Sequence, residues 1–336
     1  MSTAPTAPVT ANRQLAVWLA VSAAVTAFIA LWIGPVWVRP ADLLDDPVAR
    51  IILFELRLPR VFAALLVGAA LGAAGALMQA LLRNPLADPA LIGVSGGAAL
   101  GAALMLSVAG AGSAALFLPV PVAAFIGALA ATLTVWRLGG VRGQLQVAAV
   151  LLAGIAVNTL AGACVGLLLT FANDPTLRAT TFWLFGSLTE VRWPALVLLL
   201  GVVPLAVLHL ERRALSLDLY QLGDVEAGHA GLGVHRLQRE GILIASLLTA
   251  LAVASAGIIG FVGLMVPHFM RLLGGSGHRY RFVECALGGA VLLLVADAAA
   301  RTLAAPAEIP VGLLTALFGA PFFLFLLRRE LARTAL

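Results

Sequence analysis

The chain alternates between long apolar segments and short polar connections along its length. A helix needs about 20 predominantly apolar residues to cross a bilayer, and nine apolar blocks reach or approach that length. The blocks cover residues 15–38, 61–82, 90–109, 117–136, 146–171, 193–210, 241–270, 283–304 and 311–327. The pattern therefore predicts an all-α, polytopic membrane protein whose single transmembrane domain occupies residues 1–336.

The seventh block is too long for one membrane span. At 1.5 Å per residue, its 30 residues would form a helix of about 45 Å, whereas the hydrocarbon core is about 30 Å thick. Gly257, Gly260, Gly263 and Pro267 offer a place to break this helix. We therefore expect two short helices here and ten transmembrane helices in all.

The arginines predict the orientation of these ten helices. With ten spans both termini lie on the same side, and the segments on that side hold fourteen arginines against seven on the other. Cytoplasmic segments are enriched in basic residues, so both termini are predicted to be cytoplasmic. With nine spans, the difference in the number of arginines between the two sides would be smaller.

Composition excludes a soluble enzyme. Hydrophobic residues make up 62% of the 336 residues and charged residues 11%, with a mean hydropathy of +1.05. In soluble domains, hydrophobic residues make up about 45–50% and charged residues about 25%. The net charge of +5 comes from arginines scattered at helix ends, which indicates membrane topology rather than nucleic-acid binding. Cys164 and Cys285 lie in apolar segments and are expected to pack as core residues, and no metal site is predicted.

One polar segment, residues 211–240, is too long for a simple connection. It contains short helical stretches separated by glycines and is predicted to be a cytoplasmic loop. Loops of this length are usually functional. The chain has no nucleotide-binding motif, so we expect it to bind no cofactor and to have no energy source of its own.

Few polar residues lie close to the spans. Asp297 and Arg301 are four residues apart, so they share a helix face and are expected to pair rather than to relay protons. Arg57 and Arg60 lie on one turn before the second span, where either lipid anchoring or docking of an acidic partner is possible. Residues 83–89 are expected to form a tight capped turn, and the small residues of 93–101 to pack helices closely.

Five motifs, in order from about residue 50 onward, resemble the permease family that imports iron-siderophores, haem and cobalamin. They are RLPRVFAALLVGAALGAAGALMQALLRNPLADPALIGVSGGAALG, FWLFGSL, LGDVEAGHAGLGV, IGFVGLMVPHFMRLL and PAEIPVGLLTALFGAPFFLFLLRR. The resemblance implies a type II ABC importer permease in the bacterial inner membrane. Such permeases form homodimers with the pathway at the interface, and they work with two ATPase subunits, which bind ATP and Mg²⁺, and a periplasmic substrate-binding protein.

The resemblance also implies roles for individual residues. Arg57, Arg60 and Arg301 match family arginines that face acidic residues of the binding protein. Asn84 and Leu86 match a cytoplasmic gate turn, and Val147 and Ala148 lie near a second gate. The residues that match the ATPase-contacting coupling helices are Leu222, Gly223, Asp224, Glu226, Ala227, Gly231 and Gly233.

The substrate is a finer inference from the same resemblance. The turn after the second span and the segment APAEIPVG before the last block look more like haem permeases than cobalamin permeases. We therefore expect haem to be transported, with a ferric siderophore or cobalamin as the alternative. An ion-coupled secondary transporter is the alternative of a different class, but such proteins show charged residues at mid-membrane, and no such set occurs here.

Overall fold

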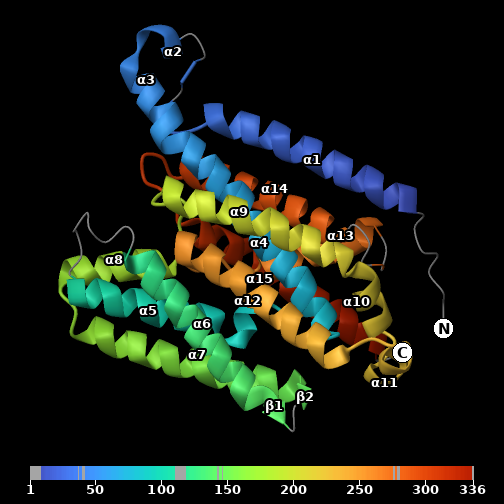
Figure 1. Cartoon of the computed structure of the whole chain (residues 1–336). Helices are drawn as coiled ribbons and strands as arrows, with labels where there is room; N and C mark the ends of the chain where they lie inside the picture. Colours follow the sequence, from blue (N-terminus) through green and yellow to red (C-terminus); the bar gives the residue numbers. More distant parts are fainter. Residues whose placement is uncertain are drawn as a thin grey trace.

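The computed structural model describes residues 9–36, 38–39, 42–109, 119–141, 144–145, 147–274, 277 and 281–334. Most of these residues are helical (Figure 1). The long helices are α1 (Val9–Trp32), α4 (Leu58–Leu81), α5 (Val94–Ala109), α6 (Pro119–Gly139), α7 (Val147–Thr170), α9 (Trp193–Arg212), α12 (Val234–Ala256), α13 (Val262–Gly274), α14 (Arg281–Thr302) and α15 (Val311–Thr334).

Shorter elements connect these helices. They are α2 (Asp42–Asp45), α3 (Pro47–Ile51), the π-helix η1 (Ile52–Arg57), the 3₁₀-helix η2 (Pro89–Ile92), α8 (Asp174–Leu184), α10 (Ala214–Tyr220) and α11 (Asp224–His229). Two two-residue strands, β1 (Gly140–Val141) and β2 (Gln144–Leu145), pair antiparallel between α6 and α7. Within the described residues, this small ladder is the one departure from an all-helical fold.

Each predicted apolar block coincides with a helix of the structure. Among the described residues, seven helices are long and apolar enough to cross a membrane. Shorter apolar stretches lie in α5 (Val94–Val108), α13 (Val262–Gly274) and α15 (Val311–Leu326). The prediction of an all-helical, polytopic membrane protein is confirmed. The number of crossings and the side on which the termini lie stay predictions.

The long seventh block is broken as its length requires. Helix α12 ends at Ala256 and α13 begins at Val262. At the break, Gly257 has φ +69°, a left-handed conformation that glycine adopts without a steric penalty. A Cβ atom at this position would lie 2.2 Å from the carbonyl oxygen of Trp183. Pro267 lies inside α13 and does not cause the break.

The second block begins earlier than we expected. We predicted a start at residue 61, with Arg57 and Arg60 on a preceding turn, and this is wrong. Segments α3, η1 and α4 run on as one helical stretch, Pro47–Leu81, that contains both arginines. Arg57 ends the π-helical segment η1, a local irregularity of a kind that occurs frequently at functional sites.

Helix α4 crosses the middle of the bundle and is buried over most of its length (Figure 1). Its backbone approaches α13 so closely that a Cβ at Gly75 would lie 2.0 Å from the carbonyl oxygen of Gly263. The same packing joins α5 to α6, where a Cβ at Gly97 would lie 2.2 Å from the carbonyl oxygen of Gly127. Close backbone approach through small residues is typical of membrane helices. The predicted packing role of the small residues in 93–101 is confirmed.

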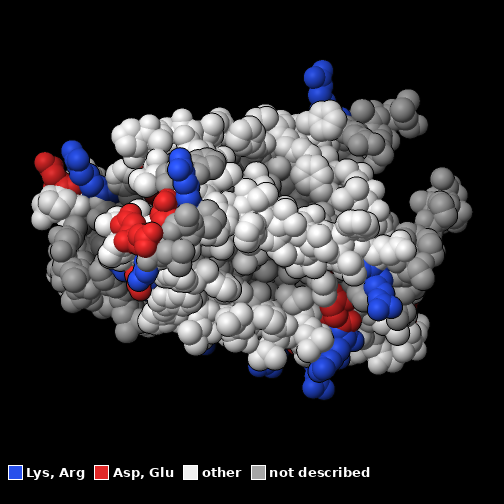
Figure 2. Space-filling model, turned by 90° about the horizontal axis from the view of Figure 1, so that it is seen from above, with Lys and Arg blue, Asp and Glu red and all other residues white. Residues whose placement is uncertain are grey.

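The surface has the charge distribution of a membrane protein. On the face shown in Figure 2, most charged side chains of the described residues gather toward the two ends, and few lie in the zone between them. Large apolar side chains such as Trp18 and Phe28 of α1 and Leu160 of α7 are exposed. An apolar surface between polar ends is what the hydrocarbon core of a bilayer requires.

Candidate functional site

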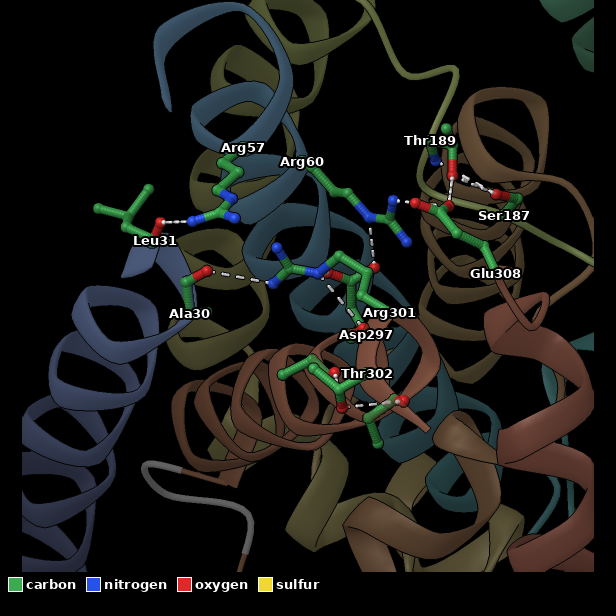
Figure 3. Close-up of polar contacts among 12 residues, drawn as sticks. Ala30, Leu31, Arg57, Arg60, Ser187, Thr189, Asp297, Arg301, Thr302 and Glu308 are labelled. Carbon is green, nitrogen blue, oxygen red and sulfur yellow. Dashed lines mark hydrogen bonds and ion pairs between the residues drawn. The ribbon is translucent and has the colours of Figure 1, made fainter. Parts of the chain in front are cut away.

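Five charged side chains from distant segments meet at one end of the bundle (Figure 3). We call this set the arginine cluster: Arg57, Arg60, Asp297, Arg301 and Glu308. Asp297 is at its centre, because its two carboxylate oxygens lie 2.7 Å from Arg60 Nε and 3.0 Å from Arg301 Nε. Arg60 also donates to Glu308 at 2.9 Å. The predicted pairing of Asp297 with Arg301 is confirmed, and Arg60 is a further partner.

Arg57 has no acidic partner in the part of the chain that the structure describes. Its guanidinium donates to the carbonyl oxygens of Leu31 and Trp32, each at 3.0 Å, and to that of Val36. Carbonyls at the C-terminal end of a helix, here α1, lack intrahelical donors and attract a cation. Three arginines face two carboxylates in the cluster, so one positive charge, that of Arg57, is unmatched.

The cluster is less exposed than its predicted position on an outer turn suggests. The exposed fractions are 5% for Arg57, 7% for Arg60 and 3% for Arg301. A buried charge is unfavourable unless it is paired and hydrogen-bonded, and Asp297, 1% exposed, satisfies two of these cations. Arg60 and Arg301 are therefore already paired within the chain. The docking role itself stays a prediction.

A cavity of about 650 Å³ lies beside Glu308. Its lining includes Arg178, Phe182 and Trp183 of α8. Partial burial alone would raise the pKa of Glu308, but the charge and hydrogen bond of Arg60, the Thr189 hydroxyl and the charge of Arg301 together outweigh burial and lower that pKa below its usual value. Glu308 therefore carries a negative charge at the edge of the cavity. The motif FWLFGSL places three aromatic residues close to a glycine, but this pattern alone does not indicate a cavity.

The predicted gate turn after α4 is held by its own polar side chains. Asn84 Oδ1 accepts a hydrogen bond from the Leu86 N–H at 2.9 Å, and the Asp88 carboxylate accepts one from the Ala90 N–H at 2.8 Å. Both side chains therefore cap exposed backbone, as expected. Asn158 Nδ2 in α7 donates to the Ala90 carbonyl at 3.0 Å and ties the following residues to that helix. A gating role for Asn84 and Leu86 stays a prediction.

The second predicted gate, Val147 and Ala148, forms the first residues of α7 directly after the β1–β2 ladder. Ala148 is exposed, and the side chain of Val147 lies outside the described part of the structure. Helix α7 reaches the region of the first gate at Asn158, about three helical turns farther along. A gating role for Val147 and Ala148 also stays a prediction.

The segment predicted as one loop over residues 211–240 is mostly helical. It contains α10 and α11, and Val234 already begins α12. The predicted coupling residues lie just before α11 (Leu222, Gly223), within it (Asp224, Glu226, Ala227) and just after it (Gly231, Gly233). Gly223 has φ +126° and Gly231 has φ +85°, conformations that favour glycine. Leu222, Asp224 and Glu226 are exposed and accessible to a partner.

Contacts that were not predicted from the sequence join this segment to the end of α4. Arg83 Nη2 donates to the Tyr220 carbonyl oxygen and to the Asp224 carboxylate, both at 2.5 Å. The Arg83 guanidinium also lies 3.9 Å from the centroid of the Tyr220 ring. Tyr220 in turn donates its hydroxyl hydrogen to the Leu81 carbonyl at 3.1 Å. Arg83 and Asp224 are 141 positions apart in the sequence, so no local pattern reveals this pairing.

Neither cysteine forms a disulfide. Cys285 is buried and Cys164 is partly buried, and both are free. Among the described residues, no group of three or more His, Cys, Asp or Glu side chains is arranged to hold a metal ion.

Comparison with known proteins decides the family. The profile of the FecCD transport family matches residues 22–329. The chain belongs to the FecCD transport family. It is 45% identical over 282 residues to the hemin transport system permease protein HmuU of Yersinia pestis, covering 83% of this chain and 84% of that one. It is 39% identical to the vitamin B12 import system permease protein BtuC of Serratia proteamaculans, covering 93% and 91%.

A solved structure supports the same assignment. It is described as an inward-facing conformation of a metal-chelate type ABC transporter, and it matches with a TM-score of 0.82 and 30% sequence identity. The match covers 94% of this chain and 99% of that chain. The arrangement of helices found here is therefore that of an ABC permease.

Membership of the FecCD family confirms the resemblance seen in the sequence. This FecCD-family chain is a multi-span permease of the type II ABC importer class, in keeping with a place in the bacterial inner membrane. It is not an enzyme, because ATP hydrolysis in such importers belongs to separate ATPase subunits. The family implies partnership with an ATPase and a substrate-binding protein, and it excludes the ion-coupled alternative.

Proposed function

We propose that this chain is the membrane-spanning subunit of an ATP-driven haem importer. The observation that carries the proposal is the 45% identity to the hemin permease of Yersinia pestis over most of both chains. Relatives named for cobalamin or vitamin B12 import share 37–41% identity, so cobalamin is the second candidate. A ferric siderophore is the remaining alternative.

The cavity beside Glu308 supports a substrate with a flat apolar ring. Phe182 and Trp183 offer apolar aromatic surface in its lining. Haem has a flat apolar ring of the kind that aromatic side chains bind well. The volume of about 650 Å³ is within the range of small-molecule sites, about 300–1,000 Å³.

The substrate is tested with the complete importer. The permease, its ATPase and its substrate-binding protein are reconstituted in liposomes, and ATP hydrolysis and uptake are measured with haem, a ferric siderophore and cobalamin. We expect haem to stimulate ATP hydrolysis and to be taken up. Stimulation and uptake with cobalamin or a siderophore, but not with haem, would overturn the haem assignment.

We infer that the working assembly contains two copies of this chain, two ATPase subunits with ATP and Mg²⁺, and one periplasmic binding protein. The two copies would form the pathway between them, and the exposed apolar surfaces of the single chain leave room for such an interface. In this assembly the arginine cluster faces the binding protein. Arg57 is the residue best suited to pair with an acidic group there, because its charge is unmatched within the described chain.

The Arg57→Gln variant tests this docking role. We expect it to weaken binding of the substrate-loaded binding protein by about fivefold or more, because an ion pair in a desolvated site exceeds the 0.2–1 kcal/mol of exposed pairs. Glutamine still donates to a helix-end carbonyl, so the fold is retained. Arg137→Gln, an exposed arginine near the end of α6, is the control. If Arg57→Gln binds the binding protein with unchanged affinity and unchanged salt dependence, Arg57 has only a structural role and the docking proposal is wrong.

We propose that α10 and α11, in the segment 211–240, contact the ATPase. The segment is polar, ordered and exposed, and Leu222 and Val225 place exposed apolar side chains beside the charges of α11. Exposed apolar groups among polar ones are typical of protein interfaces. The turn with Asn84 and Leu86, and the start of α7 at Val147 and Ala148, would close the cytoplasmic end of the pathway.

Charge reversal at Glu226 tests the coupling role. Glu226 is exposed in the first turn of α11, so Glu226→Arg is expected to leave folding intact and to lower substrate transport per ATP hydrolysed. Glu226→Gln removes the charge without reversing it and should have a smaller effect. Both are measured in proteoliposomes together with binding of the ATPase. Wild-type transport in Glu226→Arg with the ATPase bound would show that α11 is not the coupling element.

A further inference from the structure

The end of α4 has an unusual residue at a position that usually requires glycine. Arg83 has φ +48°, in the left-handed region. The Arg83 N–H donates to the Ala80 carbonyl at 3.4 Å, and the Asn84 N–H donates to the Gln79 carbonyl at 3.2 Å. These two bonds form a Schellman motif, in which the left-handed position is most often glycine. Arginine is strained there, and such outliers mark positions with a further role.

The Arg83 side chain gives the reason for this choice. From the left-handed position it reaches α10 and α11, where it contacts the Tyr220 carbonyl, the Tyr220 ring and the Asp224 carboxylate. In two further hydrogen bonds the donors lie in or next to α10 and the acceptors lie in α4. The Tyr220 hydroxyl donates to the Leu81 carbonyl, and Gln221 Nε2 donates to the Ala80 carbonyl at 2.9 Å. The Leu81 carbonyl at the end of α4 is thus satisfied by α10, and the Ala80 carbonyl gains a second donor besides the Arg83 N–H.

We propose that Arg83 is a positioning residue that makes the gate turn and the α10–α11 segment move as one unit when the ATPase acts. The inference rests on the proposed coupling role of α11 and adds the physical link to the gate. Asn84 directly follows Arg83 in the chain. A displacement of α10 and α11 therefore passes from Tyr220 and Asp224 to Arg83, and from Arg83 directly to the turn. Coupling of this kind requires a contiguous set of contacts, and these residues supply one.

The contact with Asp224 is poorly suited to a purely stabilising role. The side chains of Arg83 and Asp224 are 34% and 53% exposed. Ion pairs this exposed contribute little to stability. Glycine at position 83 would relieve the left-handed strain. Stability alone would therefore favour glycine at position 83, whereas transmission of movement requires the arginine side chain.

The Arg83→Gly variant separates these two roles. We expect it to unfold at the wild-type temperature or above, to bind the ATPase normally, and to transport about tenfold less substrate per ATP hydrolysed, the size of a coupling of about 1.4 kcal/mol. Arg83→Lys keeps the charge and should retain the larger part of transport. Arg212→Ala, which removes an exposed arginine at the end of α9, is the matched control and should behave as wild type.

A double-mutant cycle completes the test. Arg83→Gln and Asp224→Asn are measured singly and together, and we expect the double variant to lose no more transport per ATP than Arg83→Gln alone. A wild-type transport ratio in Arg83→Gly, or a loss of transport that only follows a loss of thermal stability, would overturn the inference. If Glu226→Arg also couples normally, the proposed role of α11 fails. If Glu226→Arg uncouples and Arg83→Gly does not, only the Arg83 link is wrong.

Discussion

The Asp297→Ala variant is expected to unfold with a free energy about 3–5 kcal/mol lower than the wild type, the usual effect of removing one partner from a buried ion pair. The carboxylate satisfies Arg60 and Arg301 together, and both guanidinium groups are buried. Its loss would leave the buried Arg301 without a carboxylate partner, and Arg60 would keep only the partly exposed Glu308. Equilibrium unfolding of the purified permease in detergent measures the effect.

Two further variants give this prediction its controls. Glu308→Gln removes the other carboxylate of the cluster, whose side chain is 39% exposed, and should lower stability by about 1 kcal/mol or less. Replacing Arg60, Asp297 and Arg301 together by Met, Leu and Met removes the buried ion pairs and leaves the partly exposed Glu308 to solvent. This triple variant should recover most of the loss. An Asp297→Ala variant as stable as Glu308→Gln would mean that water reaches the cluster and solvates the arginines.

The Gly75→Ala variant is expected to destabilise the permease by about 3 kcal/mol, the upper part of the range for overpacking. The added Cβ would lie 2.0 Å from the carbonyl oxygen and 2.4 Å from the Cα of Gly263. Both are backbone atoms that cannot rotate away, so α4 and α13 must move apart. Thermal unfolding in detergent measures the effect, and a reduced yield of folded protein is expected with it.

Gly201→Ala in α9 is the matched control. A Cβ at Gly201 meets no atom within 4 Å, so only the helix propensity changes, and alanine favours a helix by about 1 kcal/mol over glycine. The same substitution should therefore destabilise at Gly75 and be neutral or stabilising at Gly201. Equal effects at the two positions would mean that α4 and α13 are not in close contact.

Local pattern determined the class of fold and several of its details. Spans are set by runs of about 20 apolar residues, a property that needs no tertiary information. The break of the 241–270 block followed from length, because one straight helix would exceed the bilayer. The pairing of Asp297 with Arg301 followed from their separation of four residues on a helix. Capping by Asn84 and Asp88 followed from their places in the turn.

The tertiary structure decided which distant residues share a site. Arg60 reaches Asp297 across 237 positions, and this contact converts a local pair into a buried cluster with one unmatched charge. Arg83 reaches Asp224 across 141 positions and joins two segments that the sequence suggested only as separate sites. Periodicity and spacing report neighbours within one helix or turn, whereas these contacts depend on how helices pack. Only the packed chain shows that Arg57 keeps its charge unmatched and that Arg83 links the gate turn to α11.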